Sequence, residues 1–130
     1  MNSQIQNIVD LINHAKYCVA LTGAGISTLS GIPDFRSDET GLWQKYNPDK
    51  IFSLSHFYQD PSDFYEFSFE NIYNFISKEP SVVHEVLSIL EKTGKLKWVI
   101  TQNIDTLHQK AGSKNVLELH GSPLENTCTG

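Results

Sequence analysis

The segment Gly23-Ala24-Gly25 has the composition of a phosphate-binding turn. Glycines let the backbone approach a pyrophosphate closely, and the helix that follows such a turn offers N–H donors and a favourable dipole. The third glycine of the usual G-x-G-x-x-G pattern falls at Thr28, so the simple dinucleotide fingerprint is broken. From these residues alone, a tight turn without a ligand is as good an interpretation as a nucleotide site.

Amide and carboxylate side chains gather in the segment Gln102-Asn103-Ile104-Asp105. Gln102 and Asn103 each supply hydrogen-bond donors and acceptors, which ribose hydroxyls and an ordered water require. Asp105 can accept from an amide NH₂ and therefore suits recognition of a carboxamide. Asn and Asp are also common helix caps and turn residues, and composition alone favours that structural interpretation.

His120 is the candidate general base. A histidine at the end of a strand, followed by a glycine that leaves space, can accept a proton with a pKa near neutral pH. A single histidine is more often a structural residue, and we interpret His14, His56 and His84 in that way.

Each of these chemical segments follows a short apolar run that is typical of a buried strand. The three runs cover residues 17–22, 96–101 and 116–120. Because ligands of open α/β sheets bind outside the carboxyl ends of the strands, the shared position is stronger evidence for a site than any one segment.

Helices alternate with these runs, which predicts an α/β fold with a parallel sheet. Apolar spacing predicts a helix over about 5–12 and another that begins at Pro80 and turns Val83, Val86, Leu87 and Leu90 inward. The pattern predicts a long functional loop over residues 31–50 and two short helices, broken near Pro61, over residues 53–77.

The bulk composition is that of one globular domain of 130 residues, with 39% hydrophobic and 19% charged residues. A net charge of −5 gives no reason to expect nucleic acid and mildly favours a basic partner such as a lysine-bearing peptide, although an acidic cytoplasmic protein has the same balance. Cys18 and Cys128 are the only cysteines, so a disulfide framework is not expected. The sequence shows neither a signal peptide nor a membrane-spanning run, and we expect a cytoplasmic protein.

The stretch GAGISTLSGIPDFRS, from Gly23 to Ser37, resembles the signature opening of the sirtuins, the Sir2-like NAD-dependent protein deacylases, nearly letter for letter. Residues 101–108 keep the family pattern T-Q-N-I-D with Leu-His after one residue, and residues 118–121 match its E-L-H-G segment. The resemblance runs from the first expected helix to the last residue.

This resemblance implies a role for each segment. Gly23, Ala24 and Gly25 would hold the NAD pyrophosphate, with Ser27 nearby, and Asp34, Phe35 and Arg36 would belong to a flexible loop that closes over NAD. The other cofactor-binding residues would be Gln102, Asn103, Ile104, Asp105 and His120. His120 and Asn103 would be catalytic, whereas His108 would be structural.

The implied activity is NAD-dependent protein-lysine deacetylation, in which the acetyl group of an acetyl-lysine protein or peptide moves to ADP-ribose and nicotinamide leaves. Family members that prefer acidic acyl groups place a Tyr and an Arg three residues apart. Here Ser68 stands three residues after Tyr65, which favours neutral acyl groups. The alternatives are a sirtuin-like NAD hydrolase or ADP-ribosyltransferase, and a non-catalytic NAD-binding remnant.

The resemblance also implies that the family fold continues beyond residue 130. We expect residues 1–130 to form an incomplete NAD-binding catalytic domain, with a partial Rossmann-like parallel sheet, flanking helices and a small helical module at about 31–77. The zinc-binding module would begin at about residue 126, where Cys128 would be its first ligand. Because a structural zinc needs four ligands, we expect zinc only in a full-length form that includes a carboxy-terminal half.

Overall fold

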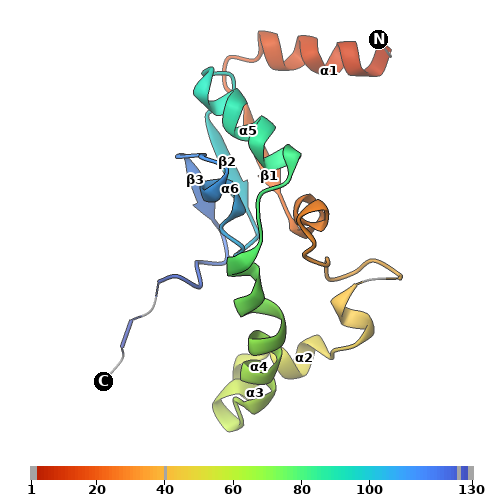
Figure 1. Ribbon diagram of the computed structural model, residues 1–130, viewed down its shortest axis with the longest axis vertical. Helices are drawn as coiled ribbons and strands as arrows, with labels where there is room; N and C mark the ends of the chain where they lie inside the picture. The colour runs from red at the N-terminus through yellow and green to blue at the C-terminus, as the bar shows by residue number, and fades with distance from the viewer. Residues whose placement is uncertain (1–2, 40, 126, 129–130) are drawn as a thin grey trace.

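Three parallel strands form the centre of the computed structural model, which describes residues 3–39, 41–125 and 127–128. The strands are β1 (Val19–Thr22), β2 (Trp98–Thr101) and β3 (Val116–Glu118), in the spatial order β1-β2-β3. Thr22 of β1 pairs with Thr101 of β2, and Thr101 pairs with Glu118 of β3. The carboxyl ends of all three strands therefore lie side by side, and the predicted parallel α/β fold is confirmed (Figure 1).

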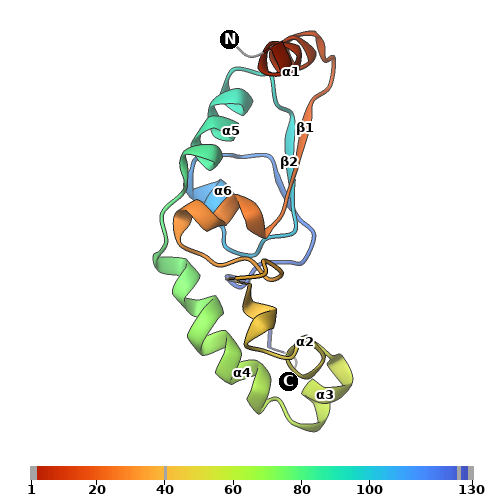
Figure 2. The same ribbon diagram turned by 90° about the vertical axis from the view of Figure 1, so that its right-hand side faces the viewer.

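Helices surround the sheet and extend away from it. The α-helices are α1 (Ser3–His14), α2 (Pro48–Ile51), α3 (Leu54–Gln59), α4 (Ser62–Phe67), α5 (Val82–Lys92) and α6 (Leu107–Lys110). Tighter or wider turns form η1 (Ala24–Ser30), η2 (Leu42–Gln44), η3 (Ser68–Ile72) and η4 (Tyr73–Ser77). In both views α1 lies at one end of the molecule and the helical module of α2, α3 and α4 at the other (Figures 1 and 2).

The helical module follows the local signals of its sequence. The Asn47 side chain accepts from the Asp49 backbone N–H, and Pro48 occupies the first turn of α2, where its missing N–H costs nothing. Ser53 caps α3 in the same way. The expected break near Pro61 is present, and η3 and η4 continue α4 to Ser77, where the predicted helical range ends.

The helical module has its own core, formed by the buried side chains of Leu42, Ile51, Phe67 and Ile72. Phe35, Trp43 and Ile104 pack against this cluster although they come from the loops next to the sheet. The module and the carboxyl ends of the strands therefore share an apolar boundary.

One face of the sheet is covered by α5 and α6, as the second view shows (Figure 2). Side chains alternate along each strand. Val99 and Thr101 point toward these helices and are buried, whereas Leu21 and Leu117 point the other way and are exposed. The strands were expected to be buried, but the part of the chain that the structure describes covers only one face of the sheet.

The predicted inner face of α5 is wrong at two positions. Val83 and Val86 are exposed, and the helix buries His84 and Ser88 instead. The reason is that α5 carries apolar residues on more than one side, so apolar spacing alone does not identify the side that meets α6. Among the described residues, none of the helices has the length and apolar character needed to span a bilayer.

Replacing Leu107 by alanine should lower the free energy of unfolding by about 2–5 kcal/mol, because removing a buried leucine side chain leaves a cavity. Leu107 is 0% exposed, whereas Leu11 is 71% exposed and serves as the matched control. Leu11→Ala should change the unfolding free energy by less than about 0.5 kcal/mol. Urea unfolding of both variants measures the difference, and equal losses would contradict the placement of α6 in the core.

Candidate active site

A cavity of about 890 Å³ opens at the carboxyl ends of β1 and β2. Most of the site residues predicted from the sequence line it: Gly23, Ala24, Gly25, Asp34, Phe35, Arg36, Gln102, Asn103, Ile104 and His120. Ser27 and Asp105 are not among the lining residues, and Cys128 is an exposed residue of the carboxyl-terminal segment. The structure therefore brings three separate sequence segments together around one space.

The glycine turn leaves room on its open side. Gly23 has an extended backbone with φ −142° and ψ −171°, and η1 begins at the next residue. A Cβ atom added at Gly23 or Gly25 would meet no other atom within 4 Å. Nothing inside the described chain requires glycine at these positions, so the space beside the turn is free for the close approach of a ligand.

Asn103 is held in the cavity wall by a buried network. Its side-chain Nδ2 donates to the carbonyl of Gly23 and to Ser27 Oγ, both at 3.1 Å. Ser27 Oγ in turn donates to Asp105 Oδ2 at 2.6 Å. Asp105 is only 6% exposed, and its Oδ1 accepts from the Leu107 N–H at 3.0 Å. In this structure Ser27 and Asp105 orient Asn103 from behind the wall of the cavity.

The turn that carries Asp105 is strained. Thr106 adopts φ 62°, a left-handed conformation that a β-branched residue rarely takes. This conformation lets the chain reverse so that the Leu107 N–H reaches Asp105. Strain of this kind persists only where the surrounding contacts hold it, and it is concentrated at functional sites.

His120 lies at the rim of the same cavity, just beyond β3. Its Nδ1 is 2.7 Å from the carbonyl oxygen of Gln102. A carbonyl can only accept, so Nδ1 carries the hydrogen and the neutral ring keeps a lone pair on Nε2. The contact with Gln102 therefore selects the tautomer in which Nε2 can take up a proton.

The segment Asp34-Phe35-Arg36 folds back on itself above the cavity. Asp34 accepts hydrogen bonds from the Ser37 side chain and from the backbone N–H groups of Ser37 and Arg36. These bonds, led by that of the Ser37 hydroxyl, lower the pKa of Asp34. The backbone of Gly41 packs tightly against Ser37. A Cβ at position 41 would lie 2.6 Å from the Ser37 carbonyl oxygen, so this close approach requires glycine.

An aromatic wall completes the cavity, and sequence reasoning missed it. Trp43 stacks on Phe35 with ring centroids 4.9 Å apart, and Phe52 meets Trp43 edge-on at 5.6 Å. Trp43 and Phe52 both line the cavity, together with Leu21, Thr22 and Ile26. The only sequence signal was an aromatic residue two positions after Gly41, which does not show where the ring points.

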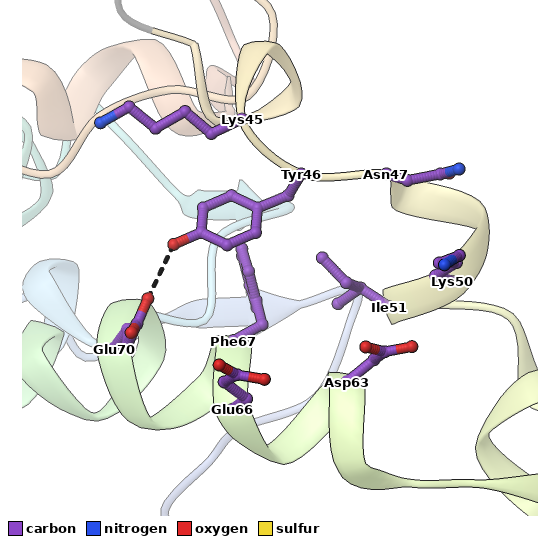
Figure 3. A pocket seen from close by; sticks show the side chains of 9 residues that line it. All are labelled: Lys45, Tyr46, Asn47, Lys50, Ile51, Asp63, Glu66, Phe67 and Glu70. Atoms are coloured by element: carbon purple, nitrogen blue, oxygen red, sulfur yellow. Dashed lines mark hydrogen bonds between the residues drawn. The ribbon is translucent and has the colours of Figure 1, made fainter.

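A second, smaller cavity of about 220 Å³ lies in the helical module (Figure 3). Ile51 and Phe67 are buried there, while positively charged lysines and negatively charged carboxylates surround the opening. Tyr46 Oη donates to Glu70 Oε2 at 2.8 Å across this space. None of the predicted site residues lines it.

Two histidines are buried behind the glycine turn, as the structural interpretation of His84 and His108 predicts. His84 is 0% exposed and His108 1% exposed, and their ring centroids are 4.8 Å apart. Burial, and next the neighbouring His84, lower the pKa of His108 from 6.5 to about 4 against the opposing charge of Asp105. Burial also lowers the pKa of His84. Both rings are therefore neutral in the folded chain at pH 7.

Cys128 has no visible set of co-ligands. Within residues 3–39, 41–125 and 127–128, no group of three or more His, Cys, Asp or Glu side chains is placed to hold a metal ion. The expected start of a zinc module at about residue 126 lies partly outside the described residues, since positions 126, 129 and 130 are not among them. These residues alone do not fit a structural zinc site.

The Sir2 family model matches residues 23–130. An NAD-dependent protein deacetylase of Thermotoga maritima is 46% identical over 125 residues, covering 96% of this chain and 50% of that protein. The NAD-dependent protein deacylase 2 of Archaeoglobus fulgidus is 48% identical over 128 residues, covering 98% of this chain and 50% of that protein. The chain therefore spans about half the length of the curated relatives it matches.

Solved structures match over the same portion. A Sir2 structure with a deacetylated p53 peptide and 3'-O-acetyl-ADP-ribose superposes with a TM-score of 0.87 at 47% identity, covering 91% of this chain and 47% of that one. A structure of Sir2 with a p53 peptide and NAD+ has a TM-score of 0.80 at 45% identity, covering 91% and 46% respectively.

Acidification should destabilise the fold through His108. The folded chain holds this ring neutral, whereas the unfolded chain protonates it near pH 6.5, so the free energy of unfolding falls between pH 6.5 and about 4. The change in the pKa from 6.5 to about 4 corresponds to about 3 kcal/mol at pH 4.

Urea unfolding from pH 7 to pH 4 measures this loss in the wild type and in His108→Gln. The pH dependence should be smaller in His108→Gln than in the wild type. A pH dependence of equal size in His108→Gln and the wild type would contradict the assignment to His108.

Proposed function

The chain belongs to the Sir2 family, and we propose that it forms the NAD-binding, catalytic half of an NAD-dependent protein-lysine deacetylase. One observation carries the proposal. His120 reaches the cavity that the glycine turn and Asn103 line, and its contact with Gln102 leaves Nε2 free to accept a proton.

The cavity fits NAD as co-substrate. Its volume of about 890 Å³ is at the upper end of the range of small-molecule sites. The open side of Gly23 and Gly25 can accept the pyrophosphate, since no atom of the described chain occupies that space. Gln102 and Asn103 present amide groups for the ribose and an ordered water. The related Sir2 structure with a p53 peptide and NAD+ supports this choice of co-substrate.

In the proposed reaction the acetyl group passes from lysine to ADP-ribose, and nicotinamide leaves from the ribose carbon that the acetyl oxygen attacks. His120 Nε2 takes the proton of a ribose hydroxyl, so that this oxygen can attack the acetyl carbon. A water then adds to that carbon, and the bond from the carbon to the lysine nitrogen breaks, which releases the free lysine and leaves O-acetyl-ADP-ribose. Asn103, fixed by Ser27, orients the ribose and a water. Phe35 and Trp43 cover the reacting face and exclude water, which would otherwise hydrolyse the activated sugar.

The remaining parts of the proposal concern the whole protein. Residues 1–130 constitute an incomplete catalytic domain with a helical insertion at about 31–77, and the substrate is an acetyl-lysine protein or peptide. A full-length form would hold structural zinc, with Cys128 as its first ligand. The free state of Cys18 and Cys128 supports a cytoplasmic location. Tyr65 and Ser68 do not line the large cavity, so the preference for neutral acyl groups rests on the sequence alone.

Replacing His120 should abolish turnover with NAD and an acetyl-lysine peptide. His120→Ala should lower kcat by about 100- to 10,000-fold, the usual contribution of a general base. His120→Asn is the sharper variant, because an Asn amide can still donate to the Gln102 carbonyl but has no basic nitrogen. Mass spectrometry follows nicotinamide and O-acetyl-ADP-ribose, and wild-type rates in His120→Asn would contradict the role as base.

The products also separate the alternatives. Nicotinamide without O-acetyl-ADP-ribose would indicate an NAD hydrolase or an ADP-ribosyltransferase. NAD binding without turnover, both in this chain and in a form extended past Cys128, would indicate a non-catalytic NAD-binding remnant. Turnover restored by the extension would indicate an incomplete catalytic domain.

Gly25→Ala should weaken NAD binding at least about tenfold, a loss of about 1.4 kcal/mol, without destabilising the fold. The added methyl group meets no atom of the described chain but occupies the space assigned to NAD. Gly94→Ala is the matched control with the opposite behaviour. Gly94 has φ 77°, so alanine there should cost about 1 kcal/mol of stability and leave NAD affinity unchanged.

Calorimetric titration with NAD and urea unfolding measure the two effects. Equal NAD affinity in Gly25→Ala and the wild type would place the pyrophosphate elsewhere.

A further inference from the structure

The proposed chemistry does not use the two buried histidines, yet both connect to the glycine turn. His108 Nε2 lies 2.9 Å from Thr22 Oγ1, a hydrogen bond between residues 86 positions apart in the sequence. Thr22 is the last residue of β1 and immediately precedes Gly23. This bond therefore fixes the chain at the entrance of the turn.

The exit of the turn is held by the start of α5. Ser81 Oγ lies 3.3 Å from the carbonyl oxygen of Ile26, the residue after Gly25, and 2.8 Å from His84 Nδ1. The backbone N–H of Ser81 also donates to His84 Nδ1 at 3.2 Å. Because Nδ1 accepts from this N–H, the neutral His84 ring carries its hydrogen on Nε2, and the single hydroxyl hydrogen of Ser81 is divided between His84 Nδ1 and the Ile26 carbonyl.

The contact between the two imidazoles joins these two attachments. The rings meet at a centroid distance of 4.8 Å and an angle of 61°. A continuous chain of contacts, which we call the brace, therefore passes behind the turn and contacts it at its entrance and its exit. Its members are Thr22, His108, His84, Ser81 and Ile26.

From this geometry we infer that His108 is a positioning residue for NAD, acting through Thr22 to hold the turn of Gly23 to Gly25. His84 supports the brace from α5. The role in NAD binding rests on the proposed function, whereas the mechanical link between His108 and the turn does not.

A histidine suits position 108 better than a charged residue would. The His108 side chain is 1% exposed, and burying a permanent charge there would be costly. A neutral imidazole can still form one directed hydrogen bond, from Nε2 to the Thr22 hydroxyl. The same turn is held from the cavity side, where Asn103 Nδ2 donates to the Gly23 carbonyl at 3.1 Å. With both bonds in place, the turn is held rigid before NAD arrives, which lowers the entropic cost of binding.

The competing view is that His108 only fills space. The variants His108→Gln and His108→Leu distinguish the two views. A Gln amide nitrogen can occupy the place of imidazole Nε2, whereas Leu fills a similar volume without a hydrogen bond. Thr22→Val removes the same bond from the other side while keeping the shape of the side chain. His56→Leu, at a surface histidine paired with Asp63, serves as the control.

The first experiment measures backbone amide hydrogen exchange at Ile26 in these variants, because the Ile26 N–H donates to the Gly23 carbonyl at 3.1 Å across the turn. Exchange should be at least tenfold faster in His108→Leu and Thr22→Val than in the wild type, and close to the wild type in His108→Gln and His56→Leu. Slow exchange in Thr22→Val, or equally fast exchange in His108→Gln and His108→Leu, would overturn the brace. This readout needs neither NAD nor turnover.

The second experiment measures nicotinamide release against NAD concentration in the same variants. KM for NAD should rise about tenfold in His108→Leu and Thr22→Val, with a smaller change in kcat, and His108→Gln should restore the wild-type KM. Faster exchange together with an unchanged KM would overturn the NAD-positioning role. If no variant, including the wild type, releases nicotinamide, the failure lies with the proposed function, and amide exchange decides the brace.

Discussion

Three parallel strands end at the same edge of the sheet, and the rest of the site depends on this alignment. β1, β2 and β3 are paired in register, and their hydrogen bonding continues beyond the strands. The Gln102 N–H donates to the Thr22 carbonyl, and the Gln102 carbonyl accepts from His120 Nδ1. Each strand therefore delivers its chemical group to the same level, and the backbone of one residue, Gln102, joins all three.

The helical module closes this arrangement from the other side. Its core of Leu42, Ile51, Phe67 and Ile72 extends to Phe35 and Trp43, which form the aromatic wall of the large cavity. The loop between the sheet and the module is shaped by its own bonds at Asp34 and by the tight approach at Gly41. The cavity thus has a polar, hydrogen-bonded floor at the strand ends and an apolar wall carried by a separate core.

Histidine serves two purposes in this chain, and burial separates them. His120 is exposed and keeps a basic nitrogen on the cavity side because its other nitrogen is bound to a carbonyl. His84 and His108 lie between α5, α6 and the sheet, where burial depresses the pKa and the rings act as neutral hydrogen-bonding spacers. The ring that takes up a proton in the proposed reaction stands at the surface, and the rings that form fixed hydrogen bonds stand inside.

The sequence by itself determined the parallel α/β fold, the three motif segments and the family, because strand and turn signals are local and the motifs are contiguous. Residues such as Gly23, Asn103 and His120 could be assigned to the site since each lies at or just beyond the end of an apolar run. Only the tertiary structure decided that Asp105 lies behind Asn103, that Trp43 and Phe52 form the wall, and that α5 buries His84 and Ser88 instead of Val83 and Val86. Those outcomes depend on which faces of helices and loops meet across long sequence separations, and no local pattern encodes the direction in which a side chain points once its partner lies 80 residues away.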